Sequence, residues 1–324
     1  MNYTYQSNFK QYIEGMLEQK RSLGSPYHRS EDYLRQFDLM CINEFPDETT
    51  LTKEIGQRWG MARDTEQKVS FQNRLAPIRE LAKYMLRLGL DAYIVEPIAI
   101  PESVRRSIPH IFTDYELSLF FKAADNIEYN ERGKIRHLIV PVIFRLMYCC
   151  GLRPNEARLI KKDDLDLDLV AGTIRISNSK GLKDRIVVMS SDVSQLMGKY
   201  LDATQRGFFE NEYLFPNWQM SDHFSAGWLH SMFWLCWNSS GIKSYSGSTP
   251  CAYSFRHTFA TKRLYAWMKE GKDLDSYLPY LSTYMGHEHF THTAYYIHLV
   301  PEFFPQMAQM DLERFGELIP EVEA

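Results

Sequence analysis

Residues 151–157 read Gly-Leu-Arg-Pro-Asn-Glu-Ala, and this short stretch predicts a tight corner between two helices. The run before it, His137 to Cys150, is apolar enough to form a buried helix, and Gly151 ends it. Pro154 suits the first turn of the following helix, because no amide hydrogen is needed there. Arg153 is therefore predicted to be held at the corner rather than on a free helix face.

Two β-rich runs follow the corner. Residues 173–177 read Thr-Ile-Arg-Ile-Ser, residues 185–189 read Arg-Ile-Val-Val-Met, and a polar stretch separates them. This arrangement predicts a β-hairpin whose turn carries Lys180 and Lys183. Helical patterns dominate the rest of the chain. The predicted fold class is therefore mainly α with a small β-hairpin or sheet, an α+β arrangement.

The chain before residue 97 also shows helical patterns. In residues 71–85, apolar side chains recur at helical spacing with basic ones between them. A new helix is predicted to begin at Thr113, which forms a capping box with Glu116. A linker is predicted between the two parts, because three prolines interrupt the helical pattern: Pro97, Pro101 and Pro109. We place the boundary near residue 105, which gives domains 1–104 and 105–324.

Composition narrows the class of protein. Of 324 residues, 44% are hydrophobic and 24% charged, as in an ordinary soluble globular protein of about two domains. No apolar run approaches the ~20 residues that a membrane span needs, and the N-terminus lacks the pattern of a signal peptide. The five cysteines form no Cys-x-x-Cys pair. They are expected to be reduced, buried thiols of a cytosolic protein.

The net charge of −4 is unevenly distributed. The acidic C-terminal tail, Asp311 to Ala324, contains five acidic residues and one basic residue, so the remainder of the chain is neutral overall. A neutral body can still present a local basic face to phosphate groups. The charge therefore neither establishes nor excludes a nucleic-acid partner.

Five residues, by their order and spacing, give the chain a resemblance to a known protein family. Residues 253–261 read Tyr-Ser-Phe-Arg-His-Thr-Phe-Ala-Thr, a histidine follows Gly286, and Tyr-Ile-His begins nine residues after that histidine. With the 151–157 motif and the hairpin, this pattern resembles the tyrosine recombinases, closely over the C-terminal two-thirds and loosely over the first hundred residues. The Met-Gly-His and Tyr-Tyr-Ile-His motifs and the 272–284 insert look most like those of transposons or integrative elements. The five residues are Arg153, Lys180, Arg256, His287 and Tyr296.

The resemblance implies a phosphate clamp and a nucleophile. Arg153 and Arg256 would hold the non-bridging oxygens of a DNA phosphate, since a guanidinium stays charged and offers a fork of donors. The alternative is that either arginine pairs with Glu156 or another acid in a surface salt bridge. Tyr296 would attack the phosphorus and form a covalent phosphotyrosine. Tyr295 is the adjacent rival, but the motif matches the family at Tyr296.

The other two residues would serve the leaving group and the phosphate. By resemblance, Lys180 is the general acid that protonates the departing 5′ oxygen, and Lys183 is the alternative. His287 would bind the phosphate or orient the nucleophile. Three histidines and a glutamate within residues 287–292 raise the alternative of a zinc site. They lack the His-x-x-x-His spacing of a helix-borne site, so no metal and no cofactor are expected.

One position departs from the family pattern. Tyr253 stands three residues before Arg256, where the family commonly has histidine. A tyrosine can donate a hydrogen bond to phosphate but is a poor base at neutral pH. We assign Tyr253 a supporting place among the site residues. His257 is interpreted as a structural helix residue.

The resemblance also implies partners. A helical N-terminal core-binding domain and a mixed catalytic domain would clamp double-stranded DNA at specific recombination sites, with Arg105 and Arg106 near the backbone. Four protomers would act together on DNA, from a chain that can be monomeric when free, and a directionality factor or partner recombinase could be required. Residues 299–310 are a candidate for docking on a neighbouring protomer. The expected location is the cytoplasm of a prokaryote, at the nucleoid. The alternatives are a type IB topoisomerase and a non-catalytic DNA-binding regulator of recombination.

Overall fold

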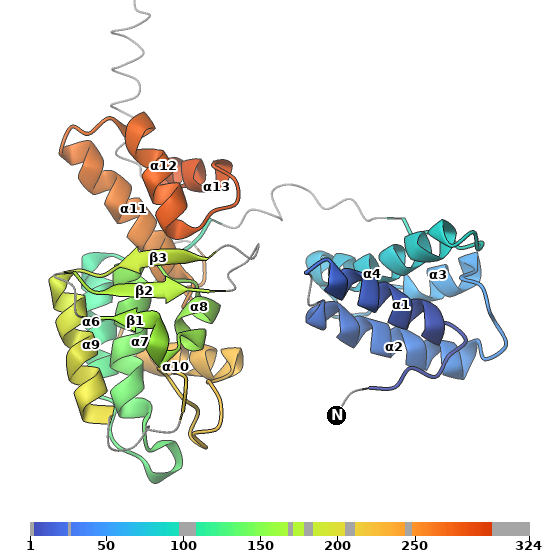
Figure 1. Ribbon diagram of the computed structural model, residues 1–324, viewed down its shortest axis with the longest axis horizontal. Helices are drawn as coiled ribbons and strands as arrows, with labels where there is room; N and C mark the ends of the chain where they lie inside the picture. Colours follow the sequence, from blue (N-terminus) through green and yellow to red (C-terminus); the bar gives the residue numbers. More distant parts are fainter. Residues whose placement is uncertain are drawn as a thin grey trace, which may run out of the picture. The chain divides into compact units, whose positions relative to one another are not determined.

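The computed structural model describes residues 3–24, 27–96, 108–167, 171–177, 184–204, 211–243 and 248–299. The chain divides into two compact units, Met1–Ser107 and Ile108–Ala324 (Figure 1). The predicted boundary between residues 104 and 105 lies outside the described residues and stays a prediction. The same holds for Arg105, Arg106, Lys180, Lys183, residues 300–310 and the acidic tail.

The described part of the first unit consists of helices packed on one core. They are α1 (Lys10–Ser22), α2 (His28–Glu44), α3 (Lys53–Trp59) and α4 (Lys68–Arg87). The predicted helical run 71–85 lies within α4. Apolar side chains from the helices and from the segment before α1 fill the core, among them Phe9, Ile13, Phe37, Trp59 and Ile78.

A buried carboxylate ties the segment before α1 to α2. Asp38 is fully buried and accepts hydrogen bonds from the Tyr3 hydroxyl (2.9 Å), the Ser7 hydroxyl (2.6 Å) and the amides of Gln6 and Ser7 (both 3.0 Å). A buried carboxylate is stable only when its oxygens are satisfied in this way. Asp38 therefore fixes where the chain enters the first unit.

Replacing this carboxylate is expected to destabilise the first unit. Asp38→Ala leaves several donors without an acceptor, which should cost about 3 kcal/mol of unfolding free energy. Urea unfolding followed by circular dichroism measures it. Asp32→Ala is the matched control, because Asp32 lies on the same helix, is exposed and pairs with the neighbouring Arg35. A loss for Asp38→Ala no larger than the control's would contradict the anchoring role.

The second unit is also mainly helical. Its α-helices are α6 (Asp114–Asp125), α7 (Arg136–Cys150), α8 (Pro154–Leu159), α9 (Ser191–Thr204), α10 (Ala226–Ser239), α11 (Ser254–Lys269), α12 (Leu274–Met285) and α13 (Thr291–Ala294). Short 3-10 turns are η1 (Glu131–Gly133), η2 (Lys162–Asp164) and η3 (Tyr295–Leu299), and the strands are β1 (Leu165–Asp166), β2 (Thr173–Ile176) and β3 (Arg185–Val188). Among the described residues, no helix is both long and apolar enough to span a membrane.

The strands form one antiparallel sheet in the order β1-β2-β3. The predicted hairpin is thus confirmed, with Thr173 opposite Val188 and Ile176 opposite Arg185. Ile174, Ile176 and Val187 face the core. This register places Arg185 at the first position of β3.

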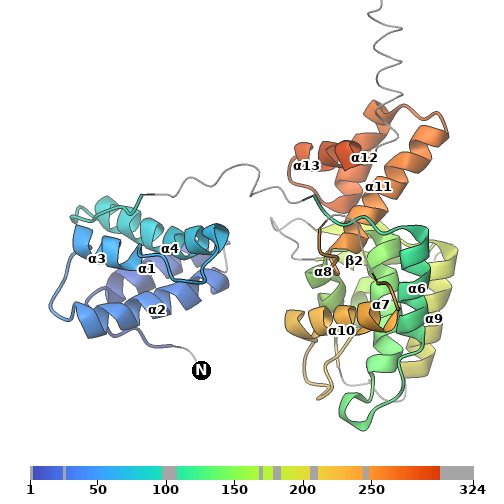
Figure 2. The same cartoon turned by 180° about the vertical axis from the view of Figure 1, so that it is seen from behind.

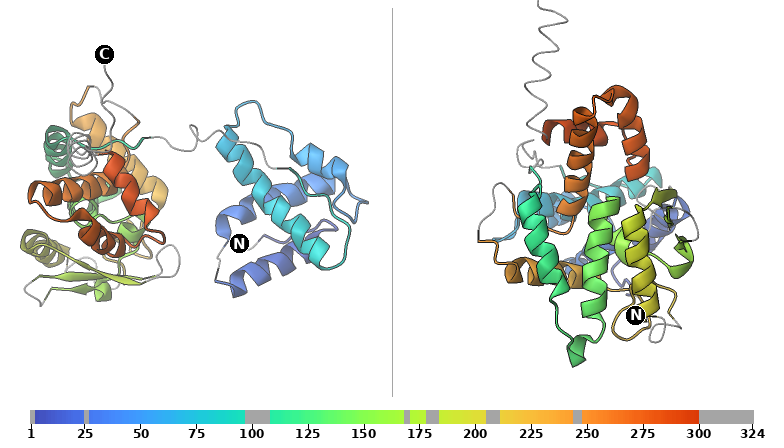
Figure 3. Two further views of the ribbon diagram at one scale, coloured as in Figure 1. Left: turned by 90° about the horizontal axis from the view of Figure 1, so that it is seen from above. Right: turned by 90° about the vertical axis from the view of Figure 1, so that its left-hand side faces the viewer.

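Aromatic side chains fill the centre of the second unit. Phe255 of α11 stacks on Phe112 at 4.8 Å between ring centroids, and Phe120, Phe144 and Phe233 surround it. Helix α7 packs against α6, α9 and α11, and Figures 2 and 3 show α6, α7 and α9 side by side. The predicted capping box of Thr113 and Glu116 begins α6. The predicted fold class, mainly α with a small sheet, is confirmed.

A smaller cluster joins α11 and α12 to the turn that follows α13. Ala260, Leu264, Leu278, Leu281 and Met285 form it, and the ring of Tyr296 packs among them. The predicted 272–284 insert largely forms α12. The C-terminal aromatic motif is thereby anchored beside the helix that carries Arg256.

The cysteine prediction needs one correction. All five cysteines are free, but Cys149 is exposed and Cys251 is intermediate, while Cys41, Cys150 and Cys236 are buried. Cys149 lies inside the apolar run that became α7. Successive residues of a helix point in different directions, so an apolar run does not bury every member.

Candidate active site

The corner predicted at residues 151–157 is present and holds Arg153. Gly151 ends α7 in the left-handed region, with φ of +61°. A Cβ at this position would lie 2.5 Å from the ring of Phe259, so both backbone and space require glycine. Arg153 caps α8, and its amide donates to Glu156 Oε2 at 2.9 Å.

The guanidinium of Arg153 lies between two acceptors. Its Nη1 donates to Glu156 Oε1 at 2.6 Å and its Nη2 to the Gly286 carbonyl at 2.8 Å. The side chain is 16% exposed. Arg153 thus bridges the 151–157 corner and the backbone before His287, 133 residues further along the chain.

Arg256 is fully buried on α11. Its Nη1 donates to the Gly151 carbonyl at 2.7 Å and its Nη2 to the Met285 carbonyl at 2.5 Å, while its Nε has no hydrogen-bond partner among the described residues. Burial, followed by the nearby charge of Arg153, lowers the pKa of Arg256 to about 10. The guanidinium of Arg256 therefore remains cationic at neutral pH. Because it bonds to the Gly151 carbonyl, both predicted clamp arginines meet at the 151–157 corner.

Sequence reasoning named Glu156 as a possible partner of these arginines but missed Arg185, which binds the same carboxylate. Glu156 is 8% exposed and receives two bonds from Arg185, Nη1 to Oε1 at 2.9 Å and Nη2 to Oε2 at 2.8 Å. Arg256 Nη1 lies 3.9 Å from Glu156 Oε2. Burial alone would raise the pKa of Glu156, but the bonds from Arg185 and Arg153 hold it at about 2.

The alternative that the arginines pair with Glu156 is therefore partly confirmed. Arg153 bonds to Glu156 and Arg256 lies near it, but the carboxylate is buried rather than at the surface. The spacing of three residues between Arg153 and Glu156 was a visible signal that the glutamate could reach back to the Arg153 amide. Nothing in the sequence connected Arg185 with Glu156, which lies 29 residues away. Only the packing of β3 against the corner brings them together.

Tyr296 lies in η3 and is 3% exposed. Its Oη is 3.1 Å from His257 Nδ1. Burial raises the pKa of this phenol to about 12, and the charge of Arg256 opposes that rise. Tyr295 is half-buried, and its ring centroid lies 6.1 Å from that of Tyr296.

His287 stacks against the nucleophile candidate. Its ring lies 6.0 Å from that of Tyr296, with an interplanar angle of 20°. Its Nδ1 is 2.6 Å from Thr293 Oγ1, which orients the imidazole. Burial, then the charges of Arg256 and Arg153, lower the pKa of His287 to about 3. Among the described residues, no group of three or more potential ligands is arranged to hold a metal ion.

Tyr253 and His257 occupy successive turns of one helix. Tyr253 caps α11, is 37% exposed, and lies 4.9 Å from the ring of His257. Burial, then Arg256, lower the pKa of His257 to about 4. His257 was interpreted as structural, but its ring reaches the hydroxyl of Tyr296. Tyr253 and His257 are four positions apart, a spacing that places both side chains on one face of a helix. That spacing was the available signal that His257 lies on the same face as the predicted site residue Tyr253.

The two depressed histidine pKa values lead to an expected pH dependence of stability. Unfolded histidine binds a proton near pH 6.5, whereas His257 and His287 resist protonation in the folded chain down to about pH 4 and 3. The unfolded state therefore binds more protons than the folded state below pH 6.5. The contribution of the two histidines to the free energy of unfolding is fully present above pH 6.5 and is lost as the pH drops toward 4.

Calorimetric unfolding of the full chain between pH 7.5 and 4.5 measures this effect. The transition of the second unit should move to lower temperature on acidification. His287→Gln should weaken that dependence by about one proton. An unchanged dependence in the variant would contradict the assignment.

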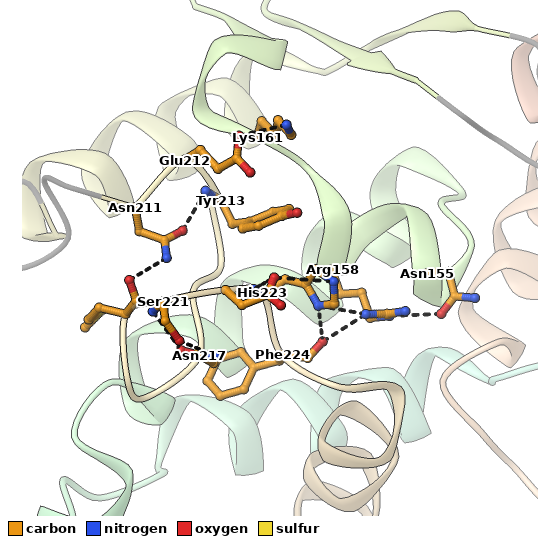
Figure 4. Close-up of polar contacts among 12 residues, drawn as sticks. Asn155, Arg158, Lys161, Asn211, Glu212, Tyr213, Asn217, Ser221, His223 and Phe224 are labelled. Carbon is orange, nitrogen blue, oxygen red and sulfur yellow. Dashed lines mark hydrogen bonds and ion pairs between the residues drawn. The ribbon is translucent and has the colours of Figure 1, made fainter. Parts of the chain in front are cut away.

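A second polar cluster fastens the other end of α8. Arg158 bonds to Asn155 Oδ1 (3.0 Å), the Phe224 carbonyl (3.0 Å) and His223 Nδ1 (2.8 Å), as Figure 4 shows. Lys161 pairs with Glu212 at 2.7 Å. These contacts tie the segment 211–224 to α8, so the helix that Arg153 caps is held at both ends.

Comparisons with known proteins agree with this arrangement. A family model described as the phage integrase family matches residues 112–302. The Sinorhizobium fredii protein y4rB, named as an integrase/recombinase, is 28% identical over 316 residues, covering 96% of this chain and 99% of that protein. Tyrosine recombinase XerA of Thermococcus kodakarensis is 28% identical over 229 residues, covering 69% and 70%.

Solved structures share the fold. The Tn1549 transposon integrase in complex with circular intermediate DNA matches with a TM-score of 0.61 and 16% identity, over 94% of this chain and 99% of that one. The XerH site-specific recombinase bound to difH substrate matches with a TM-score of 0.59 and 20% identity, over 80% and 69%.

Proposed function

The chain belongs to the phage integrase family, and from that premise we propose that it is a site-specific DNA recombinase that acts through a 3′-phosphotyrosine intermediate. One observation carries the proposal. Side chains from four separate segments, Arg153, Arg256, His287 and Tyr296, converge on one largely buried site. Two cations beside a tyrosine hydroxyl suit the displacement of an alcohol from an anionic phosphodiester.

The clamp arginines are fixed yet retain donors. A guanidinium carries five N–H groups, and the side-chain bonds described above use two on each arginine. The remaining donors are left for a phosphate, and they include the buried Nε of Arg256, which has no hydrogen-bond partner among the described residues. Donors that are already oriented need no reorganisation when charge develops, which is worth about 3 kcal/mol for each.

The proposed cleavage step exchanges one bond to phosphorus and transfers two protons, one from the nucleophile and one to the leaving group. Tyr296 Oη attacks the phosphorus, the bond to the 5′ oxygen breaks, and the 3′ phosphate becomes joined to tyrosine. His257 Nδ1 accepts the phenolic proton, for which it is neutral and 3.1 Å away. Lys180, matched by resemblance, gives a proton to the 5′ oxygen. Attack by the 5′ hydroxyl of another strand reverses these transfers without ATP.

His287 and Tyr253 take supporting roles in this proposal. His287, neutral and oriented by Thr293, donates a hydrogen bond to the phosphate through its other ring nitrogen. Tyr253 is partly exposed at the start of α11 and can donate from its hydroxyl. Neither side chain needs to change its charge during cleavage.

Double-stranded DNA with specific sites is the proposed partner, in the cytoplasm of a prokaryote. The family places the helical first unit on the DNA as a core-binding domain, and four protomers would exchange strands between two duplexes. The Tn1549 integrase and XerH structures were determined with DNA, which supports this partner. No cofactor or metal is proposed.

Covalent trapping tests the function. Wild-type protein is mixed, in the presence of chelator, with nicked duplexes made from the ends of the neighbouring mobile element. A protein–DNA adduct that resists denaturation is expected, because the nick releases the leaving strand. Bound DNA without an adduct would contradict the enzymatic proposal. Equal relaxation of plasmids with and without the sites would favour a topoisomerase instead.

A further inference from the structure

Three guanidinium groups surround a single carboxylate at the candidate site. Arg185 contacts both oxygens of Glu156, Arg153 contacts one at 2.6 Å, and Arg256 lies 3.9 Å from the other. The side chains of Arg185 and Glu156 are 8% and 6% exposed. Three positive charges and one negative charge give this cluster a net charge of +2.

The carboxylate has a structural use and an electrostatic cost. Glu156 caps α8 by accepting the amide of Arg153, which fixes the corner. The same oxygens are acceptors within reach of both clamp arginines. An unneutralised carboxylate here would compete with a DNA phosphate for their donors and would repel the phosphate itself.

Arg185 satisfies this carboxylate from a third element. Its two Nη atoms form a fork on Glu156, the arrangement in which arginine binds carboxylate most strongly. Its Nε donates to the Tyr284 carbonyl at 2.9 Å. Arg185 also packs closely against the backbone at Gly286. A Cβ added to Gly286 would lie 3.0 Å from Arg185 Nη1. That backbone supplies the carbonyls of Met285 and Gly286 that hold the clamp arginines.

We propose that Arg185 is a positioning residue that neutralises Glu156 and so keeps Arg153 and Arg256 available for the scissile phosphate. This inference rests on the proposed function. Without Arg185, Glu156 Oε2 should form an ion pair with Arg256 Nη1, which lies 3.9 Å away. The contact of Glu156 with Arg153 should also become stronger. The cluster would then carry a net charge of +1 and hold the phosphate less well as charge develops in the transition state.

A charge-balanced pair of substitutions tests this idea on the full chain. Arg185→Gln lowers the net charge of the cluster to +1, and Arg185→Gln combined with Glu156→Gln restores +2. Single-turnover cleavage of the nicked substrate is expected to slow about 100-fold in the single variant. The double variant should recover at least about tenfold of that loss, and Arg185→Lys should lie between Arg185→Gln and wild type.

Arg145→Gln is the matched control. Arg145 makes the same two-bond contact with a carboxylate, Asp125, at 2.6 and 2.7 Å, but in an exposed pair. Its cleavage rate should stay within about threefold of wild type, as for other surface pairs. Circular dichroism and thermal unfolding establish which variants are folded.

The outcomes separate the inference from the proposed function. A double variant as slow as Arg185→Gln, with both folded, would show a purely structural pair and overturn the inference. Cleavage by Arg185→Gln at the wild-type rate would overturn it as well. If Arg185→Gln does not fold, the cleavage rates of Arg185→Lys and of the double variant are compared instead. A double variant that cleaves 100-fold or more slowly than Arg185→Lys overturns the inference. Failure of the wild type to form an adduct would instead overturn the proposed function, and the inference with it.

Discussion

We expect Tyr296→Phe to bind the nicked substrate as wild type does and to form no covalent adduct. The hydroxyl is the only part removed, and the ring can keep its packing against Ala260, Leu264 and Met285. Since no other group supplies the attacking oxygen, cleavage should fall on the order of 10⁶-fold, the scale known for loss of a nucleophile. Denaturing gel electrophoresis of the labelled substrate measures it.

Tyr295→Phe is the matched control for this prediction. Tyr295 is adjacent, half-buried, and carries the same hydroxyl. It should retain the adduct at close to the wild-type level. An adduct lost in Tyr295→Phe and kept in Tyr296→Phe would assign the nucleophile to the neighbouring position, while the family membership would stand.

His257→Asn is expected to slow cleavage about 10²–10⁴-fold, the usual contribution of a general base, with DNA affinity unchanged. Asparagine can place an oxygen close to the position of Nδ1 and can still accept a hydrogen bond from Tyr296. It cannot take the proton at neutral pH. The wild-type rate should stay level above about pH 5 and fall as the pH approaches 4, where His257 takes up a proton, and the variant should lose that dependence.

Rates of adduct formation between pH 4 and 8 provide the measurement. His298→Asn is the control, because His298 lies on the same turn as Tyr296 and is exposed. A His257→Asn rate within about threefold of wild type would assign the proton elsewhere. A large loss that is equal at every pH would show that His257 only orients the tyrosine.

The short-range features could be predicted because neighbouring residues determine them. The corner at Gly151 and Pro154, the capping box at Thr113 and the β2–β3 hairpin depend on backbone preferences and spacing within a few residues. The candidate residues came from motifs of the same length, combined with the family resemblance. The burial of Cys149 was mispredicted because composition does not show which way a helix faces.

Local sequence patterns and the family resemblance were enough to predict the fold class, the helix corner that holds Arg153, and most of the residues in the proposed chemistry, but not His257. The long-range contacts of the site emerge only once the chain has packed: Arg185 with Glu156, Arg256 with the carbonyls of Gly151 and Met285, and His257 with Tyr296. These pairs are 29 to 105 residues apart along the chain. Buried donors and acceptors must be satisfied, but which groups satisfy them depends on how α11, α12 and β3 pack against the corner, and no local pattern encodes that packing.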